Sequence, residues 1–375
     1  MSEAARILRF PERVKDSASR AEALADAARC LREVAVADDE SVAVVAGEIL
    51  NNPDILLAAC HLIGQELDVE PARSLRVATA LYRGVLKSPK AFGFFDERDY
   101  FLGETALLNG RACRFLGKRA DAEIWLDRSE AGFRNTVNPS PMLSRVSLQR
   151  LALRCDMGRY HEVAELAPML KTTFQKLGMP REALQCLYVE ATSLKHTDQI
   201  SQARERFDEI CRTGDVEGES LVTGMAFVSM AELHAADGDF ELAMTAFRKA
   251  TPCLKAAGRQ MYLAHLKASV AEMLLRQGQV EAAIDAYQDA ASEYEELGMS
   301  TWVAYLRVET AGAMIQAGKH NEAAWQIAAA LPTIDQEGMT PEGLAAVALL
   351  VESAKRRSLN QSALDEVREY LRTKR

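Results

Sequence analysis

The sequence lacks any long hydrophobic run. Residues 1–20 contain no apolar stretch of the length that a secretory signal requires, and no later run approaches the roughly 20 apolar residues of a membrane helix. We therefore expect a cytoplasmic protein that has no membrane partner.

Closely spaced metal ligands and cysteine pairs are also missing. The seven cysteines are far apart, without a CxxC pair, and the six histidines are scattered. This spacing argues against a disulfide framework and against structural zinc, so we expect no metal.

The chain has no excess of positive charge. Its 45 Lys and Arg residues are outnumbered by 54 Asp and Glu residues, which gives a net charge of −9. Because nucleic acid and anionic lipid both attract clustered cations, this balance argues against nucleic acid as a partner. The densest basic cluster, Lys355, Arg356 and Arg357, is explained by the preference for cations at a helix C-terminus.

Catalytic signatures are absent as well. The sequence contains no phosphate-binding glycine loop, no HExxH and no GxSxG. Cys60 and His61 are adjacent, but neighbouring side chains on a helix point about 100° apart and cannot easily form a nucleophile pair. We therefore expect no catalytic residues and no cofactor, and predict that the protein is not an enzyme.

What the sequence does contain is a repeat of forty residues. One series of glycines recurs at this interval, and a second series lies midway between its members. The first series is Gly178, Gly218, Gly258, Gly298 and Gly338, and the second is Gly158, Asp198, Gly238, Gly278 and Gly318, with Gly117 placed 41 residues before it.

Each half-period has the pattern of one amphipathic helix. Apolar residues recur three and four apart, and the half-period ends at a residue type that readily adopts the left-handed conformation. Five residues after the mid-repeat turn the chain has a small residue, as at Ala243, and four further on a large one, as at Phe247. Small residues let helix axes approach and bulky ones fill the groove, so we predict two packed helices per repeat.

This order of small residue, turn glycine, small residue and aromatic residue resembles the tetratricopeptide repeat. The segments "MAELHAADGDFELAMTAFRKA" and "VAEMLLRQGQVEAAIDAYQDA" match best, and the forty-residue period is similar to the longer-helix variety found in sensor domains of bacterial regulators such as the maltose activator. The resemblance implies an all-α, right-handed solenoid of about eight antiparallel helix pairs, with a concave groove lined by first helices.

We predict four regions along the chain. Residues 1–20 are expected to be flexible, and residues 21–102 to form an N-terminal helical cap and a divergent repeat that ends in an aromatic insertion, residues 88–101. Residues 103–338 carry the forty-residue repeats, and residues 339–375 form capping helices.

The candidate binding residues are those that the resemblance places on the inner side of the first helices. They mix charges of both signs, hydrogen-bonding groups and aromatic rings, a combination that suits a peptide or a folded partner. The alternative is that they are ordinary solvated residues. The set comprises Arg111, Arg114, Gln149, Tyr188, Thr192, Lys195, His196, Val228, Ser229, Glu232, Glu272, Arg276, Tyr305 and Glu309.

Two features of this region allow two interpretations each. Arg111 and Arg114 could clamp a carboxylate or phosphate, or could form surface salt bridges to Glu104 or Asp121. Phe94 and Phe95 in the insertion could form a hydrophobic latch for a partner, or could pack back onto the repeats, which we favour.

The function predicted from these observations is a non-catalytic scaffold that binds a protein or peptide in its concave groove. The alternative is a regulatory sensor in which a small molecule or signalling peptide enters the groove and controls a transcription factor, sigma factor or ATPase. Self-association is left open.

Overall fold

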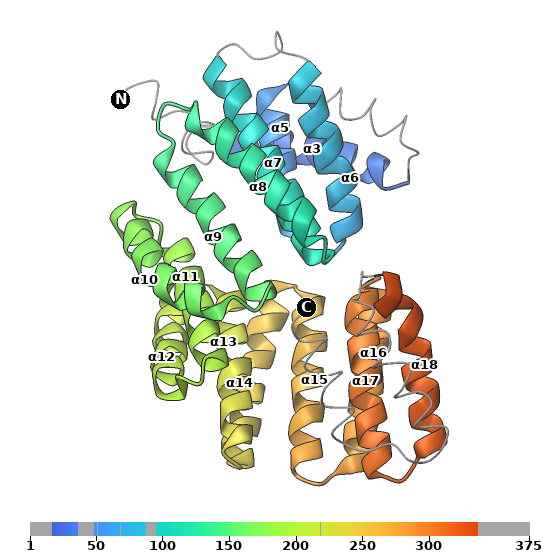
Figure 1. The fold of residues 1–375 in the computed structure, drawn as a ribbon. Helices are drawn as coiled ribbons and strands as arrows, with labels where there is room; N and C mark the ends of the chain where they lie inside the picture. The colour runs from blue at the N-terminus through green and yellow to red at the C-terminus, as the bar shows by residue number, and fades with distance from the viewer. Residues whose placement is uncertain are drawn as a thin grey trace. The chain divides into compact units, whose positions relative to one another are not determined.

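The computed structural model describes residues 17–36, 49–50, 52–67, 69–87, 95–217 and 219–336. These residues form fifteen α-helices and contain no β-strand (Figure 1). The all-α prediction is confirmed. The predicted C-terminal capping helices, residues 37–48 of the predicted N-terminal cap and Phe94 fall outside the described residues.

The chain divides into two compact units, residues 1–153 and 154–375. The division falls within α9, whereas the boundary predicted at residue 103 separates two kinds of repeat and stays a prediction. The helices of the first unit are α3 (Ser17–Val36), α5 (Pro53–Glu66), α6 (Pro71–Lys87), α7 (Phe95–Phe115), α8 (Arg119–Arg134) and most of α9 (Ser140–Asp156).

The second unit contains the most regular repeats, in which helices pack as consecutive antiparallel pairs. We call the helix before each mid-repeat turn the first helix and the one after it the second helix. The first helices are α11 (Pro180–His196), α13 (Ser220–Ala236), α15 (Gln260–Arg276) and α17 (Ser300–Gln316), and the second helices are α10 (Tyr160–Lys176), α12 (Ile200–Glu217), α14 (Phe240–Ala257), α16 (Val280–Glu296) and α18 (His320–Gln336).

The predicted turn residues do end the helices in a left-handed conformation. The glycines of both series that the structure describes have φ between 67° and 85°, and Asp198 has φ 61°. At Gly278 the turn is closed by a hydrogen bond of 2.9 Å from the Gln279 N–H to the Leu274 carbonyl. An added Cβ at Gly278 would meet nothing within 4 Å, so the backbone angle, and not lack of space, explains the glycine.

Asp198 is the one non-glycine residue with positive φ among the described residues. We expect Asp198→Gly to raise the free energy of unfolding by roughly 0.5–1 kcal/mol, because glycine removes the Cβ strain of the left-handed region. Urea denaturation measures the change. Asp239→Gly is the matched control: Asp239 has φ −83°, so this change should give no gain.

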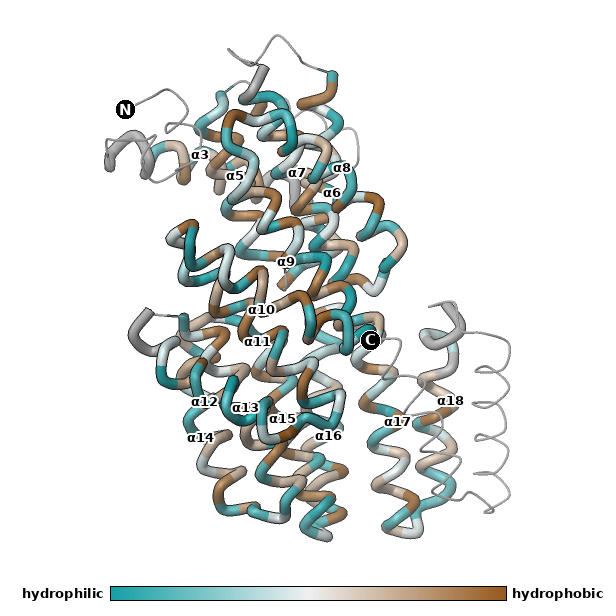
Figure 2. Tube along the Cα trace, turned by 60° about the vertical axis from the view of Figure 1, so that its left-hand side comes forward, coloured by the Kyte–Doolittle hydropathy of each residue, from teal (hydrophilic) through white to brown (hydrophobic). Residues whose placement is uncertain are grey.

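The small and large residues of the repeat pack as predicted. Ala203, Ala243, Ala283 and Ala323 are fully buried, and the large residue four positions on, such as Phe207 or Ile327, is buried too. Figure 2 shows hydrophobic and hydrophilic residues interspersed along the helices. No helix among the described residues is long and apolar enough to cross a membrane.

Part of the predicted aromatic insertion, residues 88–101, is helical. Residues 95–101 form the beginning of α7, which makes this helix 21 residues long. Phe101 is buried in the core of the first unit, and Tyr100 packs edge-on against Phe101 and Phe133, with ring centroids 5.5 and 5.9 Å apart. These two rings therefore pack back onto the repeats. At the N-terminus, α3 already begins at Ser17, so residues 17–20 of the segment predicted to be flexible are helical.

Helices α7 and α8 meet backbone to backbone. A Cβ added to Gly132 would lie 2.6 Å from the Gly103 nitrogen and 3.0 Å from the Asp99 carbonyl oxygen. The Ser129 hydroxyl donates a 2.8 Å hydrogen bond to the Gly103 carbonyl at the same crossing. Two small residues thus permit the closest helix contact of this pair.

Candidate functional site

The first helices of the second unit carry one shared face. Positions 2, 6, 9 and 13 residues before the mid-repeat turn lie within about 60° of each other on a helix that advances about 100° per residue. We call this the inner face. The residues at these positions on α11, α13, α15 and α17 include Thr192, Ser229, Glu232, His265, Ser269, Glu272, Arg276, Tyr305 and Glu309.

Glu232 links three successive first helices. The Lys195 ammonium on α11 donates a hydrogen bond to Glu232 Oε2 on α13, and the Ser269 hydroxyl on α15 donates one of 2.7 Å to Glu232 Oε1. His265 Nε2, also on α15, lies 3.9 Å from the same Oε1. We call these four residues the Glu232 cluster.

Burial and pairing decide the charge state of this cluster. Burial alone would raise the pKa of Glu232, but the Lys195 ammonium, His265 and the hydrogen bonds from Lys195 and Ser269 lower it to about 2. Burial alone would lower the pKa of Lys195, and the neighbouring Glu232 carboxylate reverses this effect and raises it. The pair is therefore ionic at neutral pH.

Tyr188 flanks the cluster on α11. Burial raises the pKa of its phenol, and the nearby Ser229 hydroxyl partly offsets this effect. Its ring lies 5.9 Å from that of Phe207, which packs it against the core of the unit. Tyr188 therefore presents a neutral hydroxyl beside a fixed ion pair.

The remaining candidates of the second unit lie in different surroundings. Glu272 and Arg276 form an exposed ion pair of 3.0 Å within α15. His196 stacks on Tyr160, with ring centroids 4.3 Å apart. Glu309 is buried, whereas Thr192 and Tyr305 are partly exposed. Val228 is buried in the core, so it is not available to a partner, contrary to the prediction.

The candidates of the first unit are held by separate contacts. Arg111 Nη2 donates to the Gly64 carbonyl at 3.5 Å, and the guanidinium of Arg114 lies 4.7 Å from the centre of the Phe115 ring. Glu104, which we considered as their salt-bridge partner, accepts two hydrogen bonds from Arg145, of 2.8 and 3.0 Å. The side chain of Phe95, the first residue of α7, is not described.

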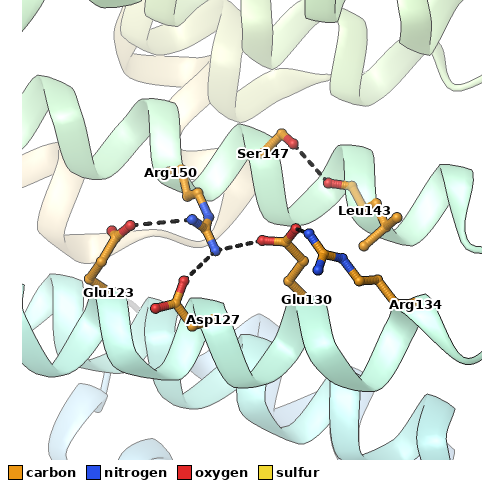
Figure 3. A network of polar contacts seen from close by, with 7 residues as sticks. All are labelled: Glu123, Asp127, Glu130, Arg134, Leu143, Ser147 and Arg150. Carbon is orange, nitrogen blue, oxygen red and sulfur yellow. Dashed lines mark hydrogen bonds and ion pairs between the residues drawn. The ribbon is translucent and has the colours of Figure 1, made fainter.

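Gln149 is partly exposed on α9, next to an arginine that ties α9 to α8. Arg150 contacts three carboxylates of α8, at 3.4 Å from Glu123, 2.7 Å from Asp127 and 2.8 Å from Glu130 (Figure 3). Because all the partners of this guanidinium belong to the same helix pair, we interpret the network as a structural link between repeats.

The described residues contain no group of three His, Cys, Asp or Glu side chains that could hold a metal ion. The seven cysteines, all in the described part of the chain, form no disulfide, and burial raises the pKa of Cys60, which favours the protonated thiol beside His61.

Sequence reasoning missed Ser269, which completes the Glu232 cluster. It lies nine residues before its turn, as Ser229 does one repeat earlier. A search of every first helix at nine residues before the turn residue would have identified Ser269.

Comparison with known proteins agrees with this architecture. Residues 179–329 match the family model "Soluble NSF attachment protein, SNAP". No curated protein sequence matches the chain.

Three solved structures share the fold. A Rap protein complexed with competence and sporulation factor is 13% identical, with a TM-score of 0.55 over 96% of this chain and 100% of that one. NprR in complex with its cognate peptide NprX is 14% identical, with a TM-score of 0.54 over 82% and 86% of the two chains. Aspartyl phosphate phosphatase F from Bacillus subtilis is 11% identical, with a TM-score of 0.50 over 78% and 77%. In fold, the chain is thus a tetratricopeptide-like α-solenoid, similar to the Rap and NprR structures.

Proposed function

We propose that the chain is a non-catalytic regulator that binds a signalling peptide on the inner face of its second unit. Binding would change how the chain contacts a second protein, such as a transcription factor, sigma factor or ATPase. The observation that carries this proposal is the Glu232 cluster, in which one carboxylate joins α11, α13 and α15. A ligand that contacts this face is in a position to affect three repeats at once.

The chemistry of the face favours a peptide. Charges of both signs and the Tyr188 phenol offer donors and acceptors, which suits the regular N–H and C=O groups of an extended chain. The similarity in fold to the Rap and NprR complexes supports this interpretation over that of a static scaffold.

The exposed Glu272–Arg276 pair allows a test that spares the cluster. From a random heptapeptide library displayed on phage, the wild-type protein should select binding peptides, and Glu272→Ala/Arg276→Ala should weaken their binding at least about tenfold, equivalent to about 1.4 kcal/mol. Asp208→Ala/Arg212→Ala removes a comparable exposed pair from the second helix α12 and should leave affinity unchanged. Calorimetry with a selected synthetic peptide measures both effects.

Hydrogen exchange separates a regulator from a static scaffold. With a selected peptide, a regulator should show altered exchange in helices that do not line the inner face, such as α14 and α16. Protection confined to α11, α13 and α15 would support the static scaffold. Equal loss of binding in both double variants would contradict the proposed face.

A further inference from the structure

A half-open pocket of about 220 Å³, called a cavity below, lies between α16, α17 and α18 in the second unit. An adjoining cavity of about 200 Å³ shares Glu295, Val303 and Arg307 with it. The space exists because small side chains line it on all three helices, among them Ala291, Ala304 and Ala329.

These cavities do not belong to the inner face. Val303, Arg307 and Thr310 of α17 lie 15, 11 and 8 residues before Gly318. At about 100° per residue, these positions point roughly 130–170° away from the middle of the inner face of the same helix. The cavities are therefore a separate feature of the fold.

Arg307 differs from its counterpart one repeat earlier. Lys267 occupies the same position before its turn and forms an ion pair with Glu293 of the following second helix, α16. The residue that corresponds to Glu293 after Arg307 is Thr333, which lines the cavity. The repeat that contains Arg307 thus has a cation at this position, as the preceding repeat does, but it has the neutral Thr333 in place of the carboxylate.

Within the described residues, neither Arg307 nor Glu295 has a side-chain hydrogen bond or ion pair, although both line the two cavities. An exposed carboxylate and a partly exposed guanidinium therefore line the same space without a charged protein partner among the described residues. The lining is mixed in polarity: buried Met299 and Val303 add apolar surface to the first pocket, and Trp325, which is 65% exposed, lines the second.

We propose that this cavity binds a small zwitterion, a free α-amino acid with an apolar or aromatic side chain. The ligand carboxylate pairs with the Arg307 guanidinium, and the ligand ammonium pairs with Glu295. The apolar side chain lies against Met299 and Val303, which line the same pocket. At about 30 Å³ for each water, a cavity of 220 Å³ holds the volume of roughly seven waters, which is of the size of such a ligand.

Charge-masked ligands test the two contacts separately. L-Phenylalanine should bind the full chain, as measured by calorimetry or by ligand-observed NMR. N-Acetyl-phenylalanine, which lacks the ammonium, and phenylalaninamide, which lacks the carboxylate, should each bind at least about tenfold more weakly, since each forfeits one charge-assisted pair.

Single substitutions assign each charge to its residue. Arg307→Gln should weaken phenylalanine binding and abolish the preference for phenylalanine over its amide. Glu295→Gln should abolish the preference over the N-acetyl form. Lys267→Gln, at the equivalent position one repeat earlier, should change neither preference. Circular dichroism confirms the fold of each variant.

Several outcomes would overturn the assignment. These are failure of the wild-type chain to bind phenylalanine, equal binding of all three ligands, or binding that Arg307→Gln and Glu295→Gln leave unaltered. Tighter binding of N-acetyl-phenylalanine than of phenylalanine would show a site for anions and not for zwitterions. None of these results bears on the peptide test at the inner face.

Discussion

Replacement of Glu232 by alanine should lower the free energy of unfolding by about 2–3 kcal/mol. The carboxylate accepts hydrogen bonds from Lys195 and Ser269, and only 24% of the Lys195 side chain is exposed. Removal of one partner of a mostly buried ion pair leaves the other charge desolvated and uncompensated. Urea denaturation with unchanged m-value measures the loss.

A double substitution distinguishes the loss of the ion pair from a general disruption of packing. Lys195→Met with Glu232→Leu removes both charges and should recover much of the stability, because two apolar groups replace the ion pair. A loss for Glu232→Ala no larger than that for the exposed pair in Asp208→Ala would show that the cluster contributes no more than a surface ion pair.

The pH dependence of the same variant provides a second measurement. The folded-state pKa of Glu232 is lowered from 4.5 to about 2, so its contribution is fully present above about pH 4.5 and is lost as the pH falls toward 2. The stability difference between wild type and Glu232→Ala should therefore shrink across this window. A difference that is constant with pH would contradict the ionic description.

Gly132→Ala should destabilise the first unit by at least about 3 kcal/mol. The new Cβ would lie 2.6 Å from a backbone nitrogen and 2.9 Å from a Cα of Gly103, and backbone cannot move aside as a side chain can. The α7–α8 pair would have to separate, which also lengthens the Ser129 hydrogen bond. Thermal unfolding followed by circular dichroism measures the effect.

Gly64→Ala is the control for this substitution. Its new Cβ would meet the nearest atoms, in the side chains of Arg111 and Leu108, at an ordinary 3.5 Å. Because alanine has the higher helix propensity, we expect stability to rise by up to about 1 kcal/mol. Equal changes at the two glycines would contradict the argument from backbone contact.

The repeats could be predicted because each is marked by a residue that the backbone requires. A turn in the left-handed conformation requires a particular residue type at that one position. Its recurrence at forty-residue intervals can therefore be read from the sequence. The beginning of α7 was not visible, since Tyr100 and Phe101 break the repeat period. The position of Tyr100 follows from packing against Phe133, a residue of the next helix.

The candidate face was predictable in outline only. Offsets from the turn placed Lys195, Glu232 and Glu272 on first helices, but sequence cannot show which side chains pair. Lys195 pairs across the repeats with Glu232, whereas Glu272 pairs within its own helix. Val228 is buried because its position lies at the edge of the face, where the next helix covers it.

The ion pairs between repeats have a consequence for how such a chain can change length. Lys195 and Glu232 are 37 residues apart, and the Lys171–Glu209 and Lys319–Glu281 pairs each span 38. Each of these ion pairs therefore joins a repeat only to the adjacent repeat. Insertion or deletion of a single repeat in evolution would then disturb only the ion pairs at the point of insertion or deletion. The chain can be lengthened or shortened by whole repeats while the other repeats keep their ion pairs.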